Sequence, residues 1–241
     1  MLQRVRYLAG QSVIYGLGTI LTQGIAFFLI PLYTRYLTPD AYGILSITSA
    51  VSTVLLSIFS LGLPSAALRF YFDTSDEERK RAIIGTVWLT SCATSAGLTV
   101  VFLLCGPSLS HWAFPDVPFY PYLALALAIT CFQTLRTLPM AFFRAREHPT
   151  RFVTFSTGTF LLTALLSILM VALMRLGARG ALVARLIAYA ISAVATTVLL
   201  LSYAKLDFRF RVAHAAILFG VPLVPAGLFA WMLRLSDRIV M

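Results

Sequence analysis

The chain has 241 residues, of which 59% are hydrophobic and only 12% are charged, and its mean hydropathy is +0.88. A soluble domain usually carries about 25% charged residues, so this composition excludes an ordinary water-soluble protein. The net charge of +10 would suit a nucleic-acid-binding protein, but the basic residues lie in alternate gaps between apolar segments, which indicates membrane topology and no nucleic-acid partner.

Seven apolar segments are long enough to cross a bilayer, since about 20 helical residues span about 30 Å of hydrocarbon. They are too long and too uniformly apolar for the strands of a membrane β-barrel. The predicted fold is therefore all-α, a polytopic transmembrane helical bundle of about seven spans. These spans are 11–33, 42–63, 83–105, 122–143, 152–174, 181–203 and 215–235.

Basic residues favour one side of the predicted bundle. Before the first span and around the second, fourth and sixth connections the chain has Arg4, Arg6, Arg69, Arg79, Lys80, Arg81, Arg144, Arg146, Arg151, Lys205, Arg209 and Arg211. The opposite connections hold only Arg35, Arg175 and Arg179. Cytoplasmic loops retain Lys and Arg, so the N-terminus is predicted to be cytoplasmic and the basic side to attract anionic membrane lipids.

The first span carries a polar stripe. Its members recur at three- and four-residue spacings, which places them on one helix face. Such a stripe in lipid must face water or another helix, so it lines a cavity or forms interhelical hydrogen bonds, and the sequence leaves both readings open. As candidate polar substrate-binding residues it supplies Gln11, Tyr15, Thr19 and Gln23.

The second span contains a proline and leads into an arginine. Pro64 removes a helical hydrogen bond and is expected to kink the helix, turning Arg69 relative to the membrane half before it.

The connections on either side of the third span carry local signals. The acidic-then-basic order of 73–81 predicts that the third helix starts before the membrane surface. The external segment 106–121 has four prolines among aromatic residues, and we expect these prolines to stop the helices and the aromatics to anchor the loop at the interface.

Arginines at membrane depth are the strongest candidates for function. Insertion scales give about 2.5–3.5 kcal/mol for an Arg at the helix centre, so such residues usually face a cavity or a partner. Arg136 lies deep in the fourth span, whereas Arg69 and Arg185 are close enough to an interface to extend their side chains to it. Arg238 closes the seventh span beside Asp237. The rigid guanidinium fork binds phosphate in bidentate fashion, so these four arginines are candidate phosphate-binding residues of a cavity.

Nothing in the sequence predicts a metal, a cofactor or an enzyme. The histidines, His111, His148 and His214, have no partner at ligand spacing, and no phosphate-binding P-loop is present. The cysteines, at positions 92, 105 and 131, lie within apolar runs without a pairing pattern. We therefore predict no catalytic residues and no metal site.

Three short motifs, in a shared order and spacing, resemble one transporter family. Residues 37–43 read LTPDAYG, similar to an L-[ST]-P-x-x-[YF]-G turn, and 62–71 read GLPSAALRFY at the end of the second span. Residues 219–238 resemble the seventh-helix pattern F-x-x-P-x-x-P-x-x-x-x-x-W-x-x-x-x-x-D-R. These motifs resemble those of the Wzx-like polysaccharide-biosynthesis flippases of the multidrug/oligosaccharidyl-lipid/polysaccharide exporter superfamily.

The resemblance implies a bundle of two six-helix lobes in the bacterial inner membrane, which flips a polyprenyl-pyrophosphate-linked oligosaccharide by alternating access and works with polysaccharide-assembly proteins. Arg69 and Arg238 match motif positions, whereas Arg136 and Arg185 are added on physical grounds. Residues 1–210 would form the first lobe and 211–241 the first helix of a second lobe, so the chain is expected to be a truncated product.

Other functions compete with this interpretation. A multidrug or cation exporter of the same superfamily would need buried carboxylates, and the first six predicted spans contain no Asp or Glu. A membrane glycosyltransferase or polymerase is expected to carry acidic or His residues on a large loop, and Asp116 alone on 106–121 is poor support. A truncated scaffold that does not transport is the third alternative.

Overall fold

The computed structural model describes residues 16, 29–113, 117–146, 149–229 and 232. The described part is helical and contains no strand. Its elements are α2 (Pro39–Ser60), α3 (Leu63–Phe72), α4 (Glu77–Ala113), η1 (Phe119–Leu123), α5 (Ala124–Ala145), α6 (Pro149–Ser167), η2 (Ile168–Leu173), α7 (Gly177–Leu201) and α8 (Phe210–Gly220). The predicted all-α fold is therefore confirmed.

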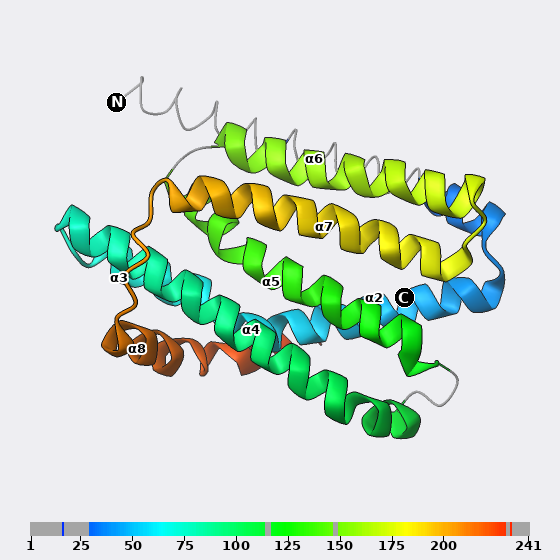
Figure 1. Cartoon of the computed structure of the whole chain (residues 1–241), viewed down its shortest axis with the longest axis horizontal. Coiled ribbons are helices and arrows are strands. Elements are labelled where there is room, and N and C mark those ends of the chain that lie inside the picture. The colour runs from blue at the N-terminus through cyan, green and yellow to red at the C-terminus, as the bar shows by residue number, and fades with distance from the viewer. Residues whose placement is uncertain (1–15, 17–28, 114–116, 147–148, 230–231, 233–241) are drawn as a thin grey trace.

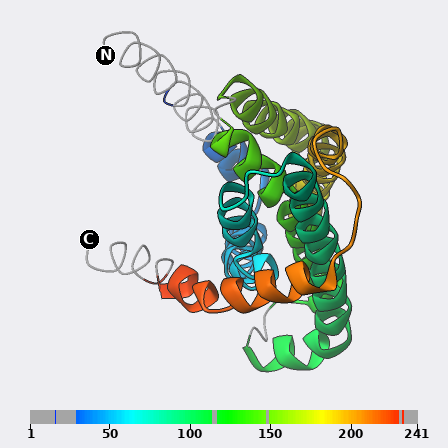
Figure 2. The same cartoon turned by 90° about the vertical axis from the view of Figure 1, so that its left-hand side faces the viewer.

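The long helices form one antiparallel bundle around α5. Helix α5 contacts α2, α4, α6 and α7, so it lies at the centre of the bundle. Figure 1 shows α6 and α7 side by side along the long axis, with the connections at 73–76 and 202–209 at the left end. Figure 2 shows α8, in orange, running across the direction of α6 and α7 instead of along it.

Six described helical stretches are long and apolar enough to cross a membrane. They are Pro39–Phe72, Glu77–His111, Phe119–Ala145, Pro149–Leu173, Gly177–Leu201 and Phe210–Phe229. These correspond to the second to seventh predicted spans. Of the first predicted span, only residues 16 and 29–33 lie within the described chain, and residues 29–36 are helical. Outward-facing Leu104, Leu165 and Val198 are more than 60% exposed, as expected for side chains that face lipid.

The predicted kink in the second span is present, and the structure locates it just before the proline. Leu61 and Gly62 both adopt left-handed backbone conformations, with φ of 45° and 63°, between α2 and α3. Pro64 then occupies the first turn of α3, where its missing N–H leaves no intrahelical bond unmade. The proline thus starts a new helix after the break.

Two glycines bring α3 and α8 into backbone contact at this break. A Cβ atom added to Gly62 would lie 2.6 Å from the carbonyl oxygen of Gly220, and one added to Gly220 would lie 2.0 Å from the carbonyl oxygen of Leu61. Helix α8 ends at Gly220, immediately before the turn that contains Pro222. The break of the second span and the break of the last span therefore touch, and we call this contact the glycine seam.

The linker 204–209 is docked on α4. A Cβ at Gly85 would lie 2.0 Å from the carbonyl oxygen of Lys205, so the glycine permits this approach. The Thr86 hydroxyl donates to the carbonyl of Asp207 over 2.7 Å, and the backbone N–H of Lys205 donates to the carbonyl of Arg81 over 3.1 Å. Main-chain contacts therefore position the start of α8 against α4.

The three basic connections lie at the same end of the bundle. The guanidinium groups of Arg146 and Arg151 lie 5.2 and 5.6 Å from the ring of Tyr203, and Arg151 also donates a hydrogen bond to its hydroxyl. Lys205 lies 3.8 Å from Glu78. The second, fourth and sixth connections therefore gather where the sequence predicts the cytoplasmic side.

Helix α4 bears out one prediction and corrects another. It begins at Glu77, and the Asp76 carboxylate accepts a hydrogen bond from the N–H of Glu78 over 3.0 Å, as expected for a helix that starts in 73–81. Its other end differs, because Pro107 does not stop the helix, which continues to Ala113. One internal proline removes a single helical hydrogen bond, and the α4 backbone continues through it.

Candidate functional site

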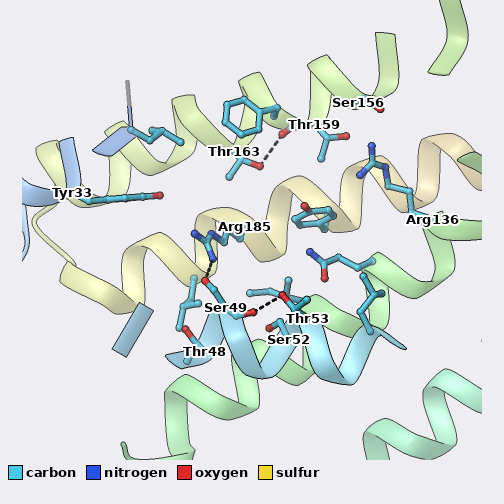
Figure 3. Close-up of a pocket in the computed structure, with 17 residues that line it drawn as sticks. Tyr33, Thr48, Ser49, Ser52, Thr53, Arg136, Ser156, Thr159, Thr163 and Arg185 are labelled. Carbon is cyan, nitrogen blue, oxygen red and sulfur yellow. Dashed lines mark hydrogen bonds between the residues drawn. The ribbon is translucent and has the colours of Figure 1, made fainter. Parts of the chain in front are cut away.

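A cavity of about 550 Å³ lies between α2, α5, α6, α7 and the helical residues before α2 (Figure 3). Its wall contains both charged and hydroxyl-bearing side chains. The lining residues are Leu29, Tyr33, Thr48, Ser49, Ser52, Thr53, Leu56, Ile129, Gln133, Arg136, Ser156, Thr159, Phe160, Thr163, Leu182, Arg185 and Tyr189.

Hydroxyl groups line two opposite walls. On α2 they are Thr48, Ser49, Ser52 and Thr53, and on α6 they are Ser156, Thr159 and Thr163. Thr53 donates to the carbonyl of Ser49 over 2.9 Å, and Thr163 donates to that of Thr159 over 2.8 Å. Because these protons go to the helix's own carbonyls, the hydroxyl oxygens keep lone pairs that can accept hydrogen bonds from a ligand in the cavity.

Arg185 crosses the cavity from α7 to α2. Its Nη1 donates to the Ser49 hydroxyl over 2.7 Å, and Figure 3 shows the guanidinium directed at that serine. The residue is half-buried, and its lining position leaves further N–H donors near the cavity. This hydrogen bond fixes the orientation of a permanently charged group inside the bundle.

Arg136 extends from α5 toward α6 (Figure 3). Its Nη2 lies 3.5 Å from the carbonyl oxygen of Phe155, which is the outer limit of a hydrogen bond, and its guanidinium lies 5.7 Å from the ring of Tyr189. The buried Nε has no hydrogen-bond partner within the described chain. A buried donor on a charged group requires a partner, so Arg136 is poised to bind water or an anionic ligand.

The cavity continues toward the basic end of the bundle. A second hollow of about 300 Å³ shares Leu56, Gln133, Arg136, Ser156 and Tyr189 with it. Its own lining includes Arg144, which lies 4.8 Å from the ring centre of Phe152. Arginines therefore occur both within the cavity and along the route from it to the predicted cytoplasmic side.

The cavity is electropositive. Among the described residues its lining contains two arginines and no carboxylate. Helices α5, α6 and α7 contain no acidic residue, because residues 117–146 and 149–206 have no Asp or Glu. Low dielectric surroundings strengthen the attraction of such a site for anions.

The structure brings together two of the four predicted arginines. Arg136 and Arg185 line the same cavity. Arg69 lies outside the lining of this cavity, and its side chain is 58% exposed. Its Nε lies 3.8 Å from the Asp73 carboxylate, and its guanidinium lies 4.7 Å from the ring centre of Phe219. The role of Arg69 in phosphate binding stays a prediction. The remaining candidates lie outside the described residues and also stay predictions: Arg238, Gln11, Tyr15, Thr19 and Gln23.

None of the hydroxyl-bearing residues that line the cavity on α2 and α6 was predicted from the sequence. Ser49 and Thr53 are four residues apart on α2, and Thr159 and Thr163 are four apart on α6, the same spacing that singled out the stripe of the first span. Applied to these spans, the periodicity would have found them. Tyr189, one turn after Arg185, follows the same rule.

Comparison with known proteins gives a family. The model of the family described as "Polysaccharide biosynthesis protein" matches residues 8–241. No curated protein sequence matches this chain.

Solved structures with a similar fold are transporters. One is MATE in complex with Br-NRF, with a TM-score of 0.74, 15% identity, and coverage of 94% of this chain and 55% of that one. Another is MATE in the straight conformation, with a TM-score of 0.72, 15% identity, and coverage of 92% and 53%. A MOP superfamily transporter from Pyrococcus furiosus matches with a TM-score of 0.65, 13% identity, and coverage of 90% and 52%. The chain spans about half the length of these structures.

Proposed function

We propose that this chain, which belongs to the polysaccharide biosynthesis protein family, flips a polyprenyl-pyrophosphate-linked oligosaccharide across the membrane by alternating access. The observation that carries the proposal is the arginine-bearing cavity, whose described lining includes many hydroxyl groups and no carboxylate. The site of action would be a bacterial inner membrane, and polysaccharide-assembly proteins would be its partners.

In this mechanism the arginines replace the water that solvates the pyrophosphate. The Arg136 guanidinium has a buried donor without a partner among the described residues, and Arg185 is oriented by Ser49, so both can present N–H groups to phosphate oxygens. Arg144 lines the route from the basic end and would meet the phosphates first. The polyprenyl chain stays in lipid, because its transfer into a polar cavity is unfavourable.

The glycan requires a different surface. The hydroxyl oxygens of Thr53 and Thr163 can accept hydrogen bonds from sugar hydroxyls, and Gln133 supplies both donors and an acceptor. Alternating access needs two lobes that rock around such a site. The glycine seam supports this, because backbone contact between the two interrupted helices would couple a movement of α8 to α3.

Multidrug or cation export is the second candidate, because the similar folds belong to MATE transporters. That chemistry favours carboxylates that bind cations, and the cavity instead presents Arg136 and Arg185. For the Pyrococcus furiosus transporter, a reverse polarity of the binding pocket has been taken to suggest a different function. The polarity of this cavity likewise favours an anionic substrate over a cationic drug.

The test is complementation of polysaccharide export with the full chain carrying Arg136→Gln or Arg185→Gln. Losing one charge-assisted contact of about 1.5–3 kcal/mol predicts about 10- to 100-fold less export. Arg179→Gln, at the opposite end of the bundle, is the control that removes the same charge. Normal export by both cavity variants at equal membrane abundance would contradict the proposal. Resistance to a cationic drug that is lost with the same variants would favour the second candidate.

A further inference from the structure

A second basic hollow, of about 400 Å³, lies where α8 meets α3 and α4. It is distinct from the candidate substrate cavity, with which it shares no lining residue. Its lining residues are Phe70, Asp73, Thr74, Arg79, Ile83, Arg211, Val212 and Ala215. We call it the seam pocket, since it adjoins the helices that the glycine seam joins.

The seam pocket has an unequal distribution of polar and apolar groups. Ile83 is 4% exposed and belongs to the same apolar cluster that Phe70 and Val212 pack against, so these side chains form a hydrophobic wall. Arg79 and Arg211 are exposed at the surface and come from the first turns of α4 and α8, which are far apart in the sequence. Apolar surface beside two cations is the complement of an amphiphile with an anionic head.

The two arginines of the seam pocket are available to a ligand. Neither Arg79 nor Arg211 has a side-chain hydrogen bond, ion pair or ring contact within the described chain. Seven other basic side chains of this end contact carboxylates or aromatic rings, and Arg81, which has no such contact among the described residues, does not line the pocket. The seven are Arg69, Lys80, Arg144, Arg146, Arg151, Lys205 and Arg209. The Asp73 carboxylate, which also lines the pocket, faces Arg69 over 3.8 Å, and this pairing reduces its repulsion of an anion.

The position of the pocket indicates which class of anion it meets. It lies at the end of the bundle where the basic connections gather, and the neighbouring Phe72 and Phe210 are 61% and 73% exposed. Such rings are stable in the membrane boundary, where anionic phospholipid head groups concentrate at the cytoplasmic surface. We propose that the seam pocket binds the phosphate of an anionic phospholipid through Arg79 and Arg211, with an acyl chain against Phe70, Ile83 and Val212.

Occupancy of this site would link α4 to α8. Arg79 belongs to α4, whereas Arg211 belongs to α8, the helix that begins after the docked linker. A phosphate shared between two guanidinium groups holds both helices through charge-assisted hydrogen bonds. Anionic lipid therefore stabilises the contact between α4 and α8.

The test is native mass spectrometry of the full chain with phosphatidylglycerol or with phosphatidylcholine, which carries the same phosphate without net charge. We expect the chain to retain phosphatidylglycerol preferentially, and the double variant Arg79→Gln, Arg211→Gln to lower that retention by about 30-fold, from about 1 kcal/mol per basic residue at a membrane surface. The variant Arg175→Gln, Arg179→Gln at the opposite end is the matched control and is expected to bind like the wild type.

A second variant guards against loss of folding. Arg79→Lys, Arg211→Lys keeps the charge and is expected to fold and to bind with intermediate strength, because ammonium groups lose the bidentate geometry. Equal phosphatidylglycerol retention by wild type and the glutamine variant would overturn the proposal. Displacement of phosphatidylglycerol by equimolar inorganic phosphate would also overturn it, since the site would then bind free phosphate and not specifically a lipid.

Discussion

The candidate substrate cavity and the seam pocket use the same residue type in different surroundings. In the cavity, Arg136 and Arg185 are half-buried between helices, and Ser49 orients one of them. In the seam pocket, Arg79 and Arg211 are exposed and rest beside an apolar wall. A guanidinium inside a bundle interacts through a low dielectric, whereas one at the surface is screened by water and salt.

An arginine's surroundings, more than its presence, therefore indicate its role. A cavity that holds two arginines among hydroxyl groups suits a charged and hydroxylated substrate, whereas an exposed pair with a hydrophobic wall suits a lipid. Arg69 is intermediate between the two, because its side chain is 58% exposed but contacts Asp73 and the ring of Phe219. Its motif position predicts substrate binding, and its contacts place it near the glycine seam.

Charge reversal gives the largest expected effect and directly compares cavity with surface. Arg136→Glu places a carboxylate in the cavity, and the loss of one charge-assisted contact of about 1.5–3 kcal/mol plus repulsion of the pyrophosphate predicts at least about 100-fold less export. Arg69→Glu, on the exposed end of α3, is expected to lower export by less than about 10-fold, because solvent screens it. Export assays at matched membrane abundance measure both variants, and equal losses would show that burial in the cavity does not set an arginine's contribution to export.

Overpacking the glycine seam is expected to have the next largest effect. Gly220→Ala places a Cβ 2.0 Å from the carbonyl oxygen of Leu61, which forces α8 away from α3 and lowers the free energy of unfolding by about 1–3 kcal/mol. Gly43→Ala in α2 is the matched control, since a Cβ there meets nothing within 4 Å. Thermal unfolding in detergent compares the two, and equal melting temperatures would show that the seam is not a tight contact.

Removal of the group that orients Arg185 is expected to have the smallest effect. Ser49→Ala deletes the 2.7 Å hydrogen bond to the guanidinium, and a loss of about 1 kcal/mol predicts about 5-fold weaker substrate binding. Ser46→Ala on the same helix is the control, because among the described residues the Ser46 hydroxyl bonds only the Tyr42 carbonyl of its own helix, and it lies outside the cavity lining. Unchanged binding by both variants would show that the orientation of Arg185 is not required.

Much of the fold followed from apolar length and charge bias, since both are local properties of the chain. The second to seventh spans and the shared end of the basic connections are as predicted. Arg136 was predicted to face a cavity because few other surroundings accept a guanidinium in a bilayer, and it lines one, whereas its role in binding a substrate stays a prediction. Pro107 was misjudged, because whether a proline ends a helix depends on the surrounding helix and not on its residue type alone.

Tertiary contacts account for what the sequence could not reveal. The contact between Gly62 and Gly220 joins residues 158 positions apart, and nothing local in either segment specifies it. The same holds for Arg185 and Ser49 on α7 and α2, and for Arg79 and Arg211 in the seam pocket. Such pairs depend on how the helices cross, which hydrophobic periodicity does not encode.

The most direct test of the central claim is to compare the binding of a polyprenyl pyrophosphate and of the matching neutral polyprenol to the full chain in nanodiscs. We expect the pyrophosphate to bind at least about 100-fold more tightly. We expect the double variant Arg136→Gln, Arg185→Gln to remove most of this difference while polyprenol binding is unchanged. Equal affinity for the two lipids in the wild type, or a preference that survives the double variant, would contradict it.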